Sequence, residues 1–316
     1  MVWGQGKAEE EKVAGGSNNH PLSSKLGKNL IISFASGKGG TGKTFIATNV
    51  ASSIKTNCQL LDCDVEAPNA GIFLKPSIIS IKSVLAKQPK ILEFKCNSCS
   101  NCVKVCQYSA LVMIKDKVLL FPEQCHFCGA CLLACPKEAI AEESRTIGTI
   151  EIGTCDSGIE FASGILNIGE QRASPIILEL KSFINLGKQL VLIDSPPGTS
   201  CPMVSSVEGS SYCVLVTEPT PFGLSDLKQA VGVLENMNIP FGVILNRVGF
   251  GNNIVEKYCQ DLNIRIIEKI PYDNYIAKTY SEGELLTKNN QKWADCFYLL
   301  SEKIIEIAKN ETNSNY

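Results

Sequence analysis

A glycine-rich segment between an apolar run and a helical pattern constrains the fold of this chain more than any other feature. The segment reads ASGKGGTGKT at residues 35–44 and fits the pattern G-x-x-x-x-G-K-[ST]. Apolar residues 30–32 precede it, and a helical pattern follows at 45–54. Glycines let successive N–H groups turn toward an anion, and a helix N-terminus adds its dipole. A chance glycine-rich turn is the alternative, but strand, loop and helix come in the required order, so we predict a nucleotide-phosphate site.

The residues of this segment have distinct expected roles. Lys43 should reach the β- and γ-phosphates, and the Thr44 hydroxyl should bind Mg²⁺. Lys38 is a second lysine, which an ordinary phosphate loop does not need, and a solvated loop lysine is the alternative to a functional one. The loop should bind the phosphates of ATP through Gly37, Gly39, Gly40, Thr41 and Gly42.

The two-lysine loop resembles the deviant phosphate loop of the SIMIBI ATPases, which include MinD, ParA, the Mrp-type scaffold proteins and the nitrogenase iron protein. The resemblance implies that Lys38 reaches across a two-fold axis to the partner's nucleotide. There it would supply positive charge where the transition state accumulates negative charge. It therefore implies an ATPase that works as a homodimer bridged by nucleotide.

A pair of aspartates matches a second motif of that family. Asp62 and Asp64 follow a predicted strand at 59–61, at the end of a parallel strand where such sheets bind ligands. The resemblance gives Asp62 a place in the Mg²⁺ shell. It gives Asp64 the task of orienting or activating the attacking water. A plain turn at the end of a strand is the alternative.

Two later segments match further nucleotide motifs. Asp194 ends an apolar strand at 189–193, and the resemblance assigns it to Mg²⁺ through water. Gly198 would offer a backbone N–H to the γ-phosphate, which makes 195–202 the expected switch. Asn246 and Arg247 follow a strand at 241–245 and resemble the pair that reads the adenine base. A strand-end turn is again the alternative for this pair.

Eight of the fifteen cysteines repeat the spacing C-x-x-C-x-x-C-x-x-x-C twice. This is the pattern of two-cluster ferredoxins, in which the fourth cysteine of each run binds the other cluster. A zinc site is a weak alternative, and clusters that act only as structural staples are another. The pattern predicts one 4Fe–4S cluster on Cys96, Cys99, Cys102 and Cys135, and a second on Cys125, Cys128, Cys131 and Cys106.

The order of the motifs gives a domain organisation. From 29 to 310 the chain resembles MinD-superfamily ATPases that carry an inserted ferredoxin domain, and the insertion contains an internal repeat of roughly thirty residues. We expect a doubly wound, mostly parallel α/β sheet with a small inserted α+β domain. The expected parts are a disordered extension at 1–28, the ATPase core at 29–91 and 143–310, the insertion at 92–142, and a polar tail at 311–316.

Composition excludes several other classes. The 316 residues are 44% hydrophobic and carry a net charge of −2, so no global field favours nucleic acid. With two histidines, histidine-based catalysis is improbable. No apolar run approaches the ~18 residues of a membrane span, and the predicted closing helix at 292–308 leads to a polar tail. We expect a cytoplasmic protein without a membrane anchor.

Seven cysteines lie outside the ferredoxin pattern, and most are expected to be small buried apolar residues. Cys201 differs because it lies just beyond the predicted switch. In the nitrogenase iron protein a cysteine in this region binds a cluster shared across the dimer, so a shared cluster is one hypothesis for Cys201. The seven are Cys58, Cys63, Cys155, Cys201, Cys213, Cys259 and Cys296.

Three hypotheses cover the use of ATP hydrolysis. In the first, nucleotide state controls the clusters and gates electron delivery to a partner protein, which two clusters fused beside the switch favour. In the second, the protein carries or assembles clusters for an acceptor, which closeness to the Mrp branch and Cys201 favour. In the third, it is a positioning module of the MinD or ParA type, against which the missing amphipathic tail and basic surface argue.

Overall fold

The computed structural model describes residues 29–54, 57–249 and 253–314. The predicted extension at 1–28 lies outside these residues. The described residues form a nine-stranded sheet of order β11-β10-β9-β1-β8-β2-β7-β6-β3. Its strands from β11 to β7 run parallel, which confirms the expected mostly parallel α/β fold. These strands are β1 (Leu30–Ala35), β2 (Cys58–Asp62), β7 (Glu160–Leu166), β8 (Leu190–Asp194), β9 (Tyr212–Thr217), β10 (Phe241–Val248) and β11 (Ile266–Pro271).

Helices cover both faces of the sheet because the central strands are apolar on both sides. In β1, the Ile32 and Phe34 side chains join a core cluster with one group of helices, while Ile31 faces the other side. The first group contains α1 (Lys43–Ser53), α2 (Ala70–Leu74), α9 (Asn274–Ser281), α10 (Leu286–Asn289) and α11 (Gln291–Ser314). The second contains α5 (Ser174–Lys181), α6 (Cys201–Val207), α7 (Pro221–Asn236) and α8 (Ile254–Asp261).

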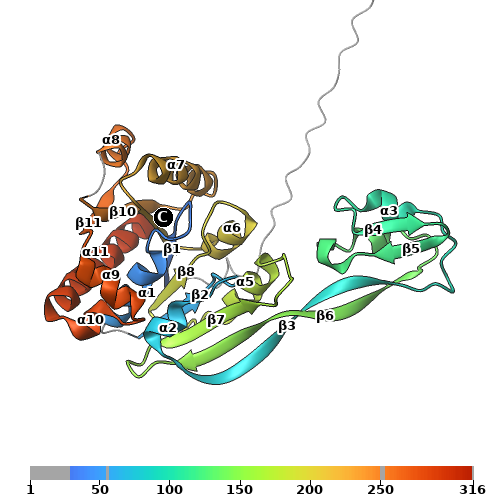
Figure 1. Cartoon of the computed structure of the whole chain (residues 1–316), viewed down its shortest axis with the longest axis horizontal. Coiled ribbons are helices and arrows are strands. Elements are labelled where there is room, and N and C mark those ends of the chain that lie inside the picture. Colours follow the sequence, from blue (N-terminus) through green and yellow to red (C-terminus); the bar gives the residue numbers. More distant parts are fainter. Residues whose placement is uncertain (1–28, 55–56, 250–252, 315–316) are drawn as a thin grey trace, which may run out of the picture.

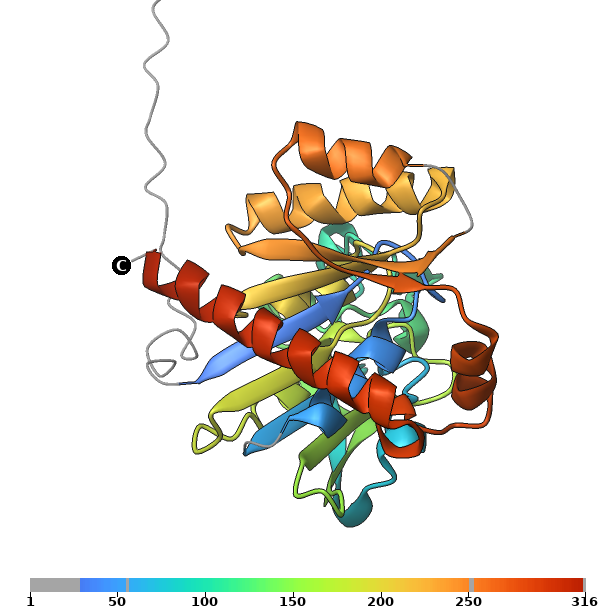
Figure 2. The same ribbon diagram turned by 90° about the vertical axis from the view of Figure 1, so that its left-hand side faces the viewer.

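The last helix is longer than the sequence pattern predicts. Figure 2 shows α11 lying across one face of the sheet. Its apolar side chains Phe297 and Ile304 are buried in the core, so this face is used in packing. The helix continues through Ser314 and so extends into the predicted polar tail at 311–316. Within the described residues, no helix is both long and apolar enough to cross a membrane.

Two long antiparallel strands form a twisted ribbon at the edge of the sheet. They are β3 (Ser77–Ile91) and β6 (Ile140–Thr154), which pair along their length. Only the inner half of β6, from Gly148 to Thr154, also pairs with β7. The outer half of the ribbon therefore projects beyond the sheet, as Figure 1 shows. The sequence analysis did not predict this ribbon. Most side chains of β3 are exposed, so the strand lacks the alternation of apolar and polar residues that identifies an amphipathic strand.

The residues between the two ribbon strands form a small cysteine-rich module at the ribbon's far end (Figure 1). Its apolar core contains Leu111 and Val118 with several cysteines. Residues 111–114 and 117–120 of this module pair as an antiparallel hairpin. The elements are α3 (Asn101–Val105), β4 (Leu111–Ile114), β5 (Lys117–Leu120), the 3₁₀ turn η1 (Pro122–Gln124) and α4 (Ala130–Leu133).

Candidate functional site

The glycine-rich loop connects β1 to α1 and has little room for side chains. Gly42 has a φ of 96°, and an added Cβ would lie 2.4 Å from Nδ2 of Asn246. At Gly37 an added Cβ would lie 2.2 Å from the backbone oxygen of Asp226 in α7. Both positions therefore require glycine, for conformation and for close approach. The predicted strand, loop and helix are present in that order.

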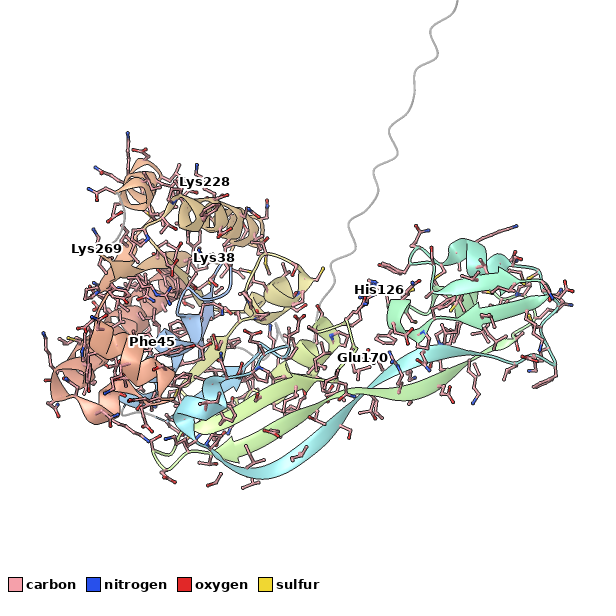
Figure 3. The ribbon with its side chains drawn as sticks, viewed as in Figure 1. Lys38, Phe45, His126, Glu170, Lys228 and Lys269 are labelled. Carbon is pink, nitrogen blue, oxygen red and sulfur yellow. The ribbon has the colours of Figure 1, made fainter. Side chains whose placement is uncertain are left out.

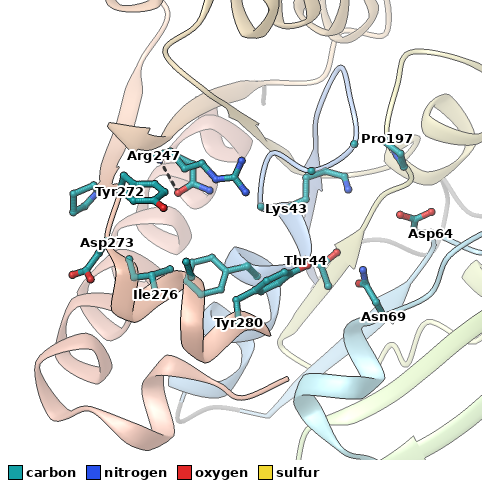
Figure 4. A pocket seen from close by; sticks show the side chains of 17 residues that line it. Lys43, Thr44, Asp64, Asn69, Pro197, Arg247, Tyr272, Asp273, Ile276 and Tyr280 are labelled. Atoms are coloured by element: carbon teal, nitrogen blue, oxygen red, sulfur yellow. Dashed lines mark hydrogen bonds between the residues drawn. The ribbon is translucent and has the colours of Figure 1, made fainter. Parts of the chain in front are cut away.

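A cavity of about 390 Å³ opens beside this loop. In Figure 4, Lys43 and Thr44 lie between Asp64 and Asn69 on one side and Tyr272 and Ile276 on the other. Glycine-rich backbone, a buried lysine and aromatic rings give the cavity an anion-binding part and an apolar part. Its lining is Gly39, Gly40, Gly42, Lys43, Thr44, Phe45, Asp64, Asn69, Pro197, Asn246, Arg247, Pro271, Tyr272, Asp273, Ile276, Ala277 and Tyr280.

Thr44 and Asp194 lie in contact at the bottom of the loop. The Thr44 hydroxyl donates to Oδ2 of Asp194 at 2.5 Å. Asp194 is fully buried, and its Oδ1 has no hydrogen-bond partner among the described residues. Burial raises the pKa of the Asp194 carboxyl, while the positive charge of Lys43 and the Thr44 bond lower it. A buried carboxylate oxygen without a partner, next to a hydroxyl, fits the oxygen ligands that Mg²⁺ takes.

Asp62 organises its own loop and is not among the residues that line the cavity. Its carboxylate accepts hydrogen bonds from the N–H groups of Asp64 at 3.2 Å, Asn69 at 3.0 Å and Ala70 at 2.9 Å. Burial raises the pKa of Asp62 well above its usual value, and the neighbouring charge of Asp194 adds to this. The structure therefore gives Asp62 a scaffolding role in placing Asp64 and Asn69. Its expected place in the Mg²⁺ shell stays a prediction.

Asp64 lines the cavity and is expected to titrate near neutral pH. Burial raises its pKa to about 6, with Lys43 opposing the rise. Because the folded-state pKa exceeds the unfolded one, the contribution of Asp64 to the free energy of unfolding is lost as the pH rises from about 4 to about 6. A ¹³C NMR titration of the nucleotide-free protein, assigned with Asp64→Asn, should give a midpoint of about 6. Lys43→Met should raise it further, and a midpoint near 4 would contradict this site geometry.

The second lysine of the loop is bound within its own chain. Lys38 Nζ lies 3.4 Å from Oε2 of Glu218, a residue directly after β9. Arg247 pairs with the other oxygen of Glu218. Glu218 therefore neutralises two cations beside the cavity. In this single chain, Lys38 is therefore engaged in an ion pair with Glu218.

The Asn246–Arg247 pair lines the cavity, but its amide is already engaged. Asn246 Nδ2 donates to the Thr41 carbonyl at 2.8 Å, and its Oδ1 accepts from the Arg247 N–H at 3.0 Å, the bond drawn in Figure 4. Arg247 has a φ of 58°, in the left-handed region. Asn246 thus ties β10 to the phosphate loop. Base recognition by this pair stays a prediction.

The predicted switch closes onto the phosphate loop. The Gly198 N–H, expected to contact a γ-phosphate, donates instead to the Ser36 carbonyl at 2.9 Å. A phosphate contact would require that bond to be exchanged. Pro197 lines the cavity, and α6 begins four residues later at Cys201, which is exposed. The switch residues therefore lead directly into α6.

Sequence reasoning missed the apolar side of the cavity. Tyr272, Asp273, Ile276 and Tyr280 come from the end of β11 and from α9, a helix that was not predicted. The available indication was position: Pro271 and Tyr272 lie at the end of β11, at the carboxyl edge of the sheet, where ligands bind. No motif marks these residues.

The structure brings the eight patterned cysteines into two groups, each around a small cavity. We call the group Cys106, Cys125, Cys128 and Cys131 the proximal centre. We call the group Cys96, Cys99, Cys102 and Cys135 the distal centre. These are the two quartets that the crossed spacing predicts. Within the described residues, no three His, Cys, Asp or Glu side chains are grouped closely enough to hold a single metal ion. A 4Fe–4S cluster does not require such a group, because each of its four thiolates binds a different iron.

The two halves of the module share an unusual backbone. Positive φ angles recur at matched positions, 59° at Ser98 and 56° at Phe127, and 64° at Ser100 and 72° at Gly129. The predicted internal repeat therefore extends to the backbone of the cysteine loops. Burial raises the pKa of the Cys131 thiol to about 11, against the effect of its own N–H and that of Leu132. Metal binding to these thiols would release protons.

Comparison with known proteins assigns the chain to a family. The family model "CobQ/CobB/MinD/ParA nucleotide binding domain" matches residues 32–286. The chain belongs to this family of P-loop nucleotide-binding proteins, whose superfamily members are typically ATPases.

Individual relatives agree with this assignment. An uncharacterized protein of Methanocaldococcus jannaschii is 32% identical over 265 residues, which cover 83% of this chain and 93% of that protein. An iron-sulfur cluster carrier protein of Aquifex aeolicus is 23% identical over 303 residues, 90% of this chain and 69% of its own length. The Mg-ADP complex of MinD from Pyrococcus horikoshii has the same fold, with a TM-score of 0.56 and 19% identity, covering 90% of this chain and 98% of that one.

Proposed function

We propose that this protein is a Mg²⁺-dependent ATPase in which the state of the bound nucleotide controls two 4Fe–4S clusters that pass electrons to a partner protein. The single observation that carries the proposal is the pair of cysteine-lined cavities on a ribbon that belongs to the same sheet as the phosphate loop. Such an arrangement joins a redox module to a nucleotide switch within one chain. The redox or acceptor partner is a separate protein.

The nucleotide would bind in the 390 Å³ cavity. Phosphates would lie against the loop N–H groups and Lys43, and Mg²⁺ would be bound by Thr44 and Asp194. The unpartnered Oδ1 of Asp194 supports this assignment. Tyr272 and Ile276 give the base an apolar surface.

Hydrolysis would use Asp64 to orient the attacking water and Lys38 of a second subunit to neutralise developing charge. MinD and ParA family members dimerise, which supports a homodimer bridged by nucleotide. In each chain, Lys38 would have to leave Glu218 to reach the partner's nucleotide. Nucleotide-dependent dimerisation and exchange of this ion pair would therefore occur together.

The two cysteine centres would each hold a 4Fe–4S cluster. Bound there, such clusters supply one-electron chemistry at potentials set by hydrogen bonds and exposure. The thiols are free, and left-handed turns at Ser98 and Phe127 curve the backbone around the two cavities. These features fit thiolate ligation of a cubane at each centre.

Cys131→Ser is expected to remove one cluster of two. Cys131 is buried and lines the proximal cavity, so its loss leaves one iron there without a thiolate. Iron and acid-labile sulfide in anaerobically purified protein should fall from about eight to about four of each per chain. The exposed Cys296 outside both centres provides the control, because Cys296→Ser should keep the full content. Unchanged iron in Cys131→Ser would contradict the proximal assignment.

A cluster carrier or assembly factor is the second candidate function. The similarity to the iron-sulfur cluster carrier protein of Aquifex aeolicus favours it. Ligation by four thiolates at each centre argues for firm retention. Transfer to an apo-acceptor distinguishes the two functions, because only a carrier must deliver its cluster. Loss of both clusters to an apo-ferredoxin within minutes, accelerated by ATP, would favour the carrier.

A further inference from the structure

The proximal centre is held against the nucleotide-binding part of the chain by a specific contact. Figure 3 labels His126, in the loop of that centre, and Glu170, which lies between β7 and α5. Glu170 is paired with Arg145 of β6 through two bonds, Nη1–Oε1 at 2.5 Å and Nη2–Oε2 at 3.1 Å. A bidentate pair of this kind fixes orientation as well as distance. The Glu170 side chain is only 9% exposed, so water screens the pair weakly.

Arg145 also contacts the cysteine loop on its other side. Its guanidinium carbon lies 5.9 Å from the centre of the Phe127 ring, and Nη2 lies 3.5 Å from the Pro122 carbonyl. Phe127 packs against the core cluster that includes Ile147 of β6 and Ile176 of α5. One arginine therefore joins the loop of the proximal centre to the loop that begins α5.

The internal repeat indicates that Phe127 serves this contact. A left-handed backbone is unfavourable for a bulky residue. The matched position of the distal loop has the same conformation and a serine, Ser98. The turn itself therefore does not require an aromatic ring. In Figure 1 the distal loop lies on the side of the module that faces away from α5. The proximal loop reaches the core cluster through the Phe127 ring.

The other end of α5 is tied to the helix that follows the switch. Lys181 is 4% exposed, and its ammonium donates to the carbonyls of Ser205 at 2.8 Å and Glu208 at 2.5 Å. These carbonyls lie at the end of α6, the helix that starts directly after residues 195–200. A buried ammonium satisfied by two carbonyls of one helix end fixes the two helices together.

We propose that Arg145, Glu170 and Phe127 form the contact through which the nucleotide-dependent switch acts on the proximal centre, by way of α6, Lys181 and α5. The inference rests on the proposed function and adds the route by which the nucleotide state acts on the proximal centre. A change at residues 195–200 moves α6, α5 follows through Lys181, and the Glu170 loop then repositions the proximal cysteine loop. Within the part of the chain that the structure describes, the distal centre has no such connection, so it responds through the module.

Hydrogen exchange of the full-length, cluster-loaded protein tests this route. Samples with Mg-ADP are compared with samples that hold Mg²⁺ and a non-hydrolysable ATP analogue. In the parent, exchange at residues 120–130 should differ by about fivefold or more between the two nucleotides, as expected for coupled sites. Glu170→Gln and Phe127→Ser should each reduce this difference to less than about twofold. The nucleotide-dependent difference in hydrogen exchange at residues 195–207 should remain in both variants.

Controls separate coupling from simple loosening. Glu143→Gln breaks the exposed Lys90–Glu143 pair, which joins the two ribbon strands and does not touch the core, and should leave every difference unchanged. Iron content should match the parent in all variants, and each variant should remain folded at the assay temperature. A parent without a nucleotide effect at 120–130, or a Glu170→Gln variant that keeps it, would overturn the route. If cluster potentials still responded to nucleotide in that variant, the proposed function would stand and this inference alone would fail.

Discussion

Lys43→Ala is expected to reduce ATP hydrolysis to background and to weaken nucleotide binding. Lys43 is buried within the phosphate loop and lines the cavity, whereas the neighbouring cations Lys38 and Arg247 are paired with Glu218. Removal of Lys43 also leaves Asp64 and Asp194 without the positive charge that lowers their pKa values. Phosphate release and binding of a fluorescent ATP analogue measure the two effects separately.

A lysine outside the site provides the matched control. Lys75 forms an exposed pair with Glu284 at 2.6 Å and does not line the nucleotide cavity. Lys75→Ala should keep turnover within about twofold of the parent, because surface pairs contribute little. If Lys43→Ala hydrolysed ATP like the parent, the phosphate-loop assignment would be wrong.

Lys38→Ala is expected to lower turnover by about 10³-fold while leaving nucleotide binding nearly intact, because a cation supplied in trans acts mainly on the transition state. Glu218→Gln should have the opposite, smaller effect. It releases Lys38 from its ion pair within the chain and should raise basal turnover by about two- to fivefold. This fold-change corresponds to the free energy that a partly exposed ion pair contributes. Steady-state turnover at several protein concentrations measures both.

Mixing two inactive variants tests whether Lys38 acts across the dimer. In a mixed dimer of Lys38→Ala and Asp64→Ala, one of the two sites has both an intact Asp64 and an intact Lys38 from the partner. An equimolar mixture should therefore recover roughly a quarter of the parent activity, because half of the dimers are mixed and each has one working site. A mixture as inactive as its components would show that Lys38 acts within its own chain.

The nucleotide site was largely predictable because its residues are fixed by local backbone geometry. Gly37 and Gly42 have no room for a side chain, Asp194 ends β8, and Thr44 lies in the first turn of α1, which follows the neighbouring parallel strand β1. Such constraints act over a few residues and leave a readable pattern. The crossed grouping of the cysteines follows from spacing for the same reason.

Other parts depend on partners that are distant in sequence. The ribbon strands pair with each other across the whole module, so neither shows an apolar face of its own. Glu218 and Tyr272 enter the site through loops whose sequences carry no motif. Asp62 matched a family motif, yet its carboxylate is occupied by backbone N–H groups of its own loop. Tertiary hydrogen bonds decide such roles, and a linear pattern does not contain them.

The contact between Arg145 and Glu170 illustrates the same limit. The two residues are 25 positions apart, and no motif of the sequence analysis includes either of them. Their pairing exists because the ribbon folds the proximal cysteine loop back toward α5. Only the folded chain joins the cysteine-rich module to the loop that precedes α5.

An anaerobic redox titration with EPR detection tests the central claim most directly. It follows both clusters in the full-length protein without nucleotide, with Mg-ADP, and with Mg²⁺ and a non-hydrolysable ATP analogue. Coupling of about tenfold between nucleotide and electron binding would appear as a shift of about 59 mV for a one-electron cluster. We predict such a shift at the proximal centre. Two clusters with potentials and line shapes indifferent to nucleotide would contradict gated electron transfer and would favour the carrier function.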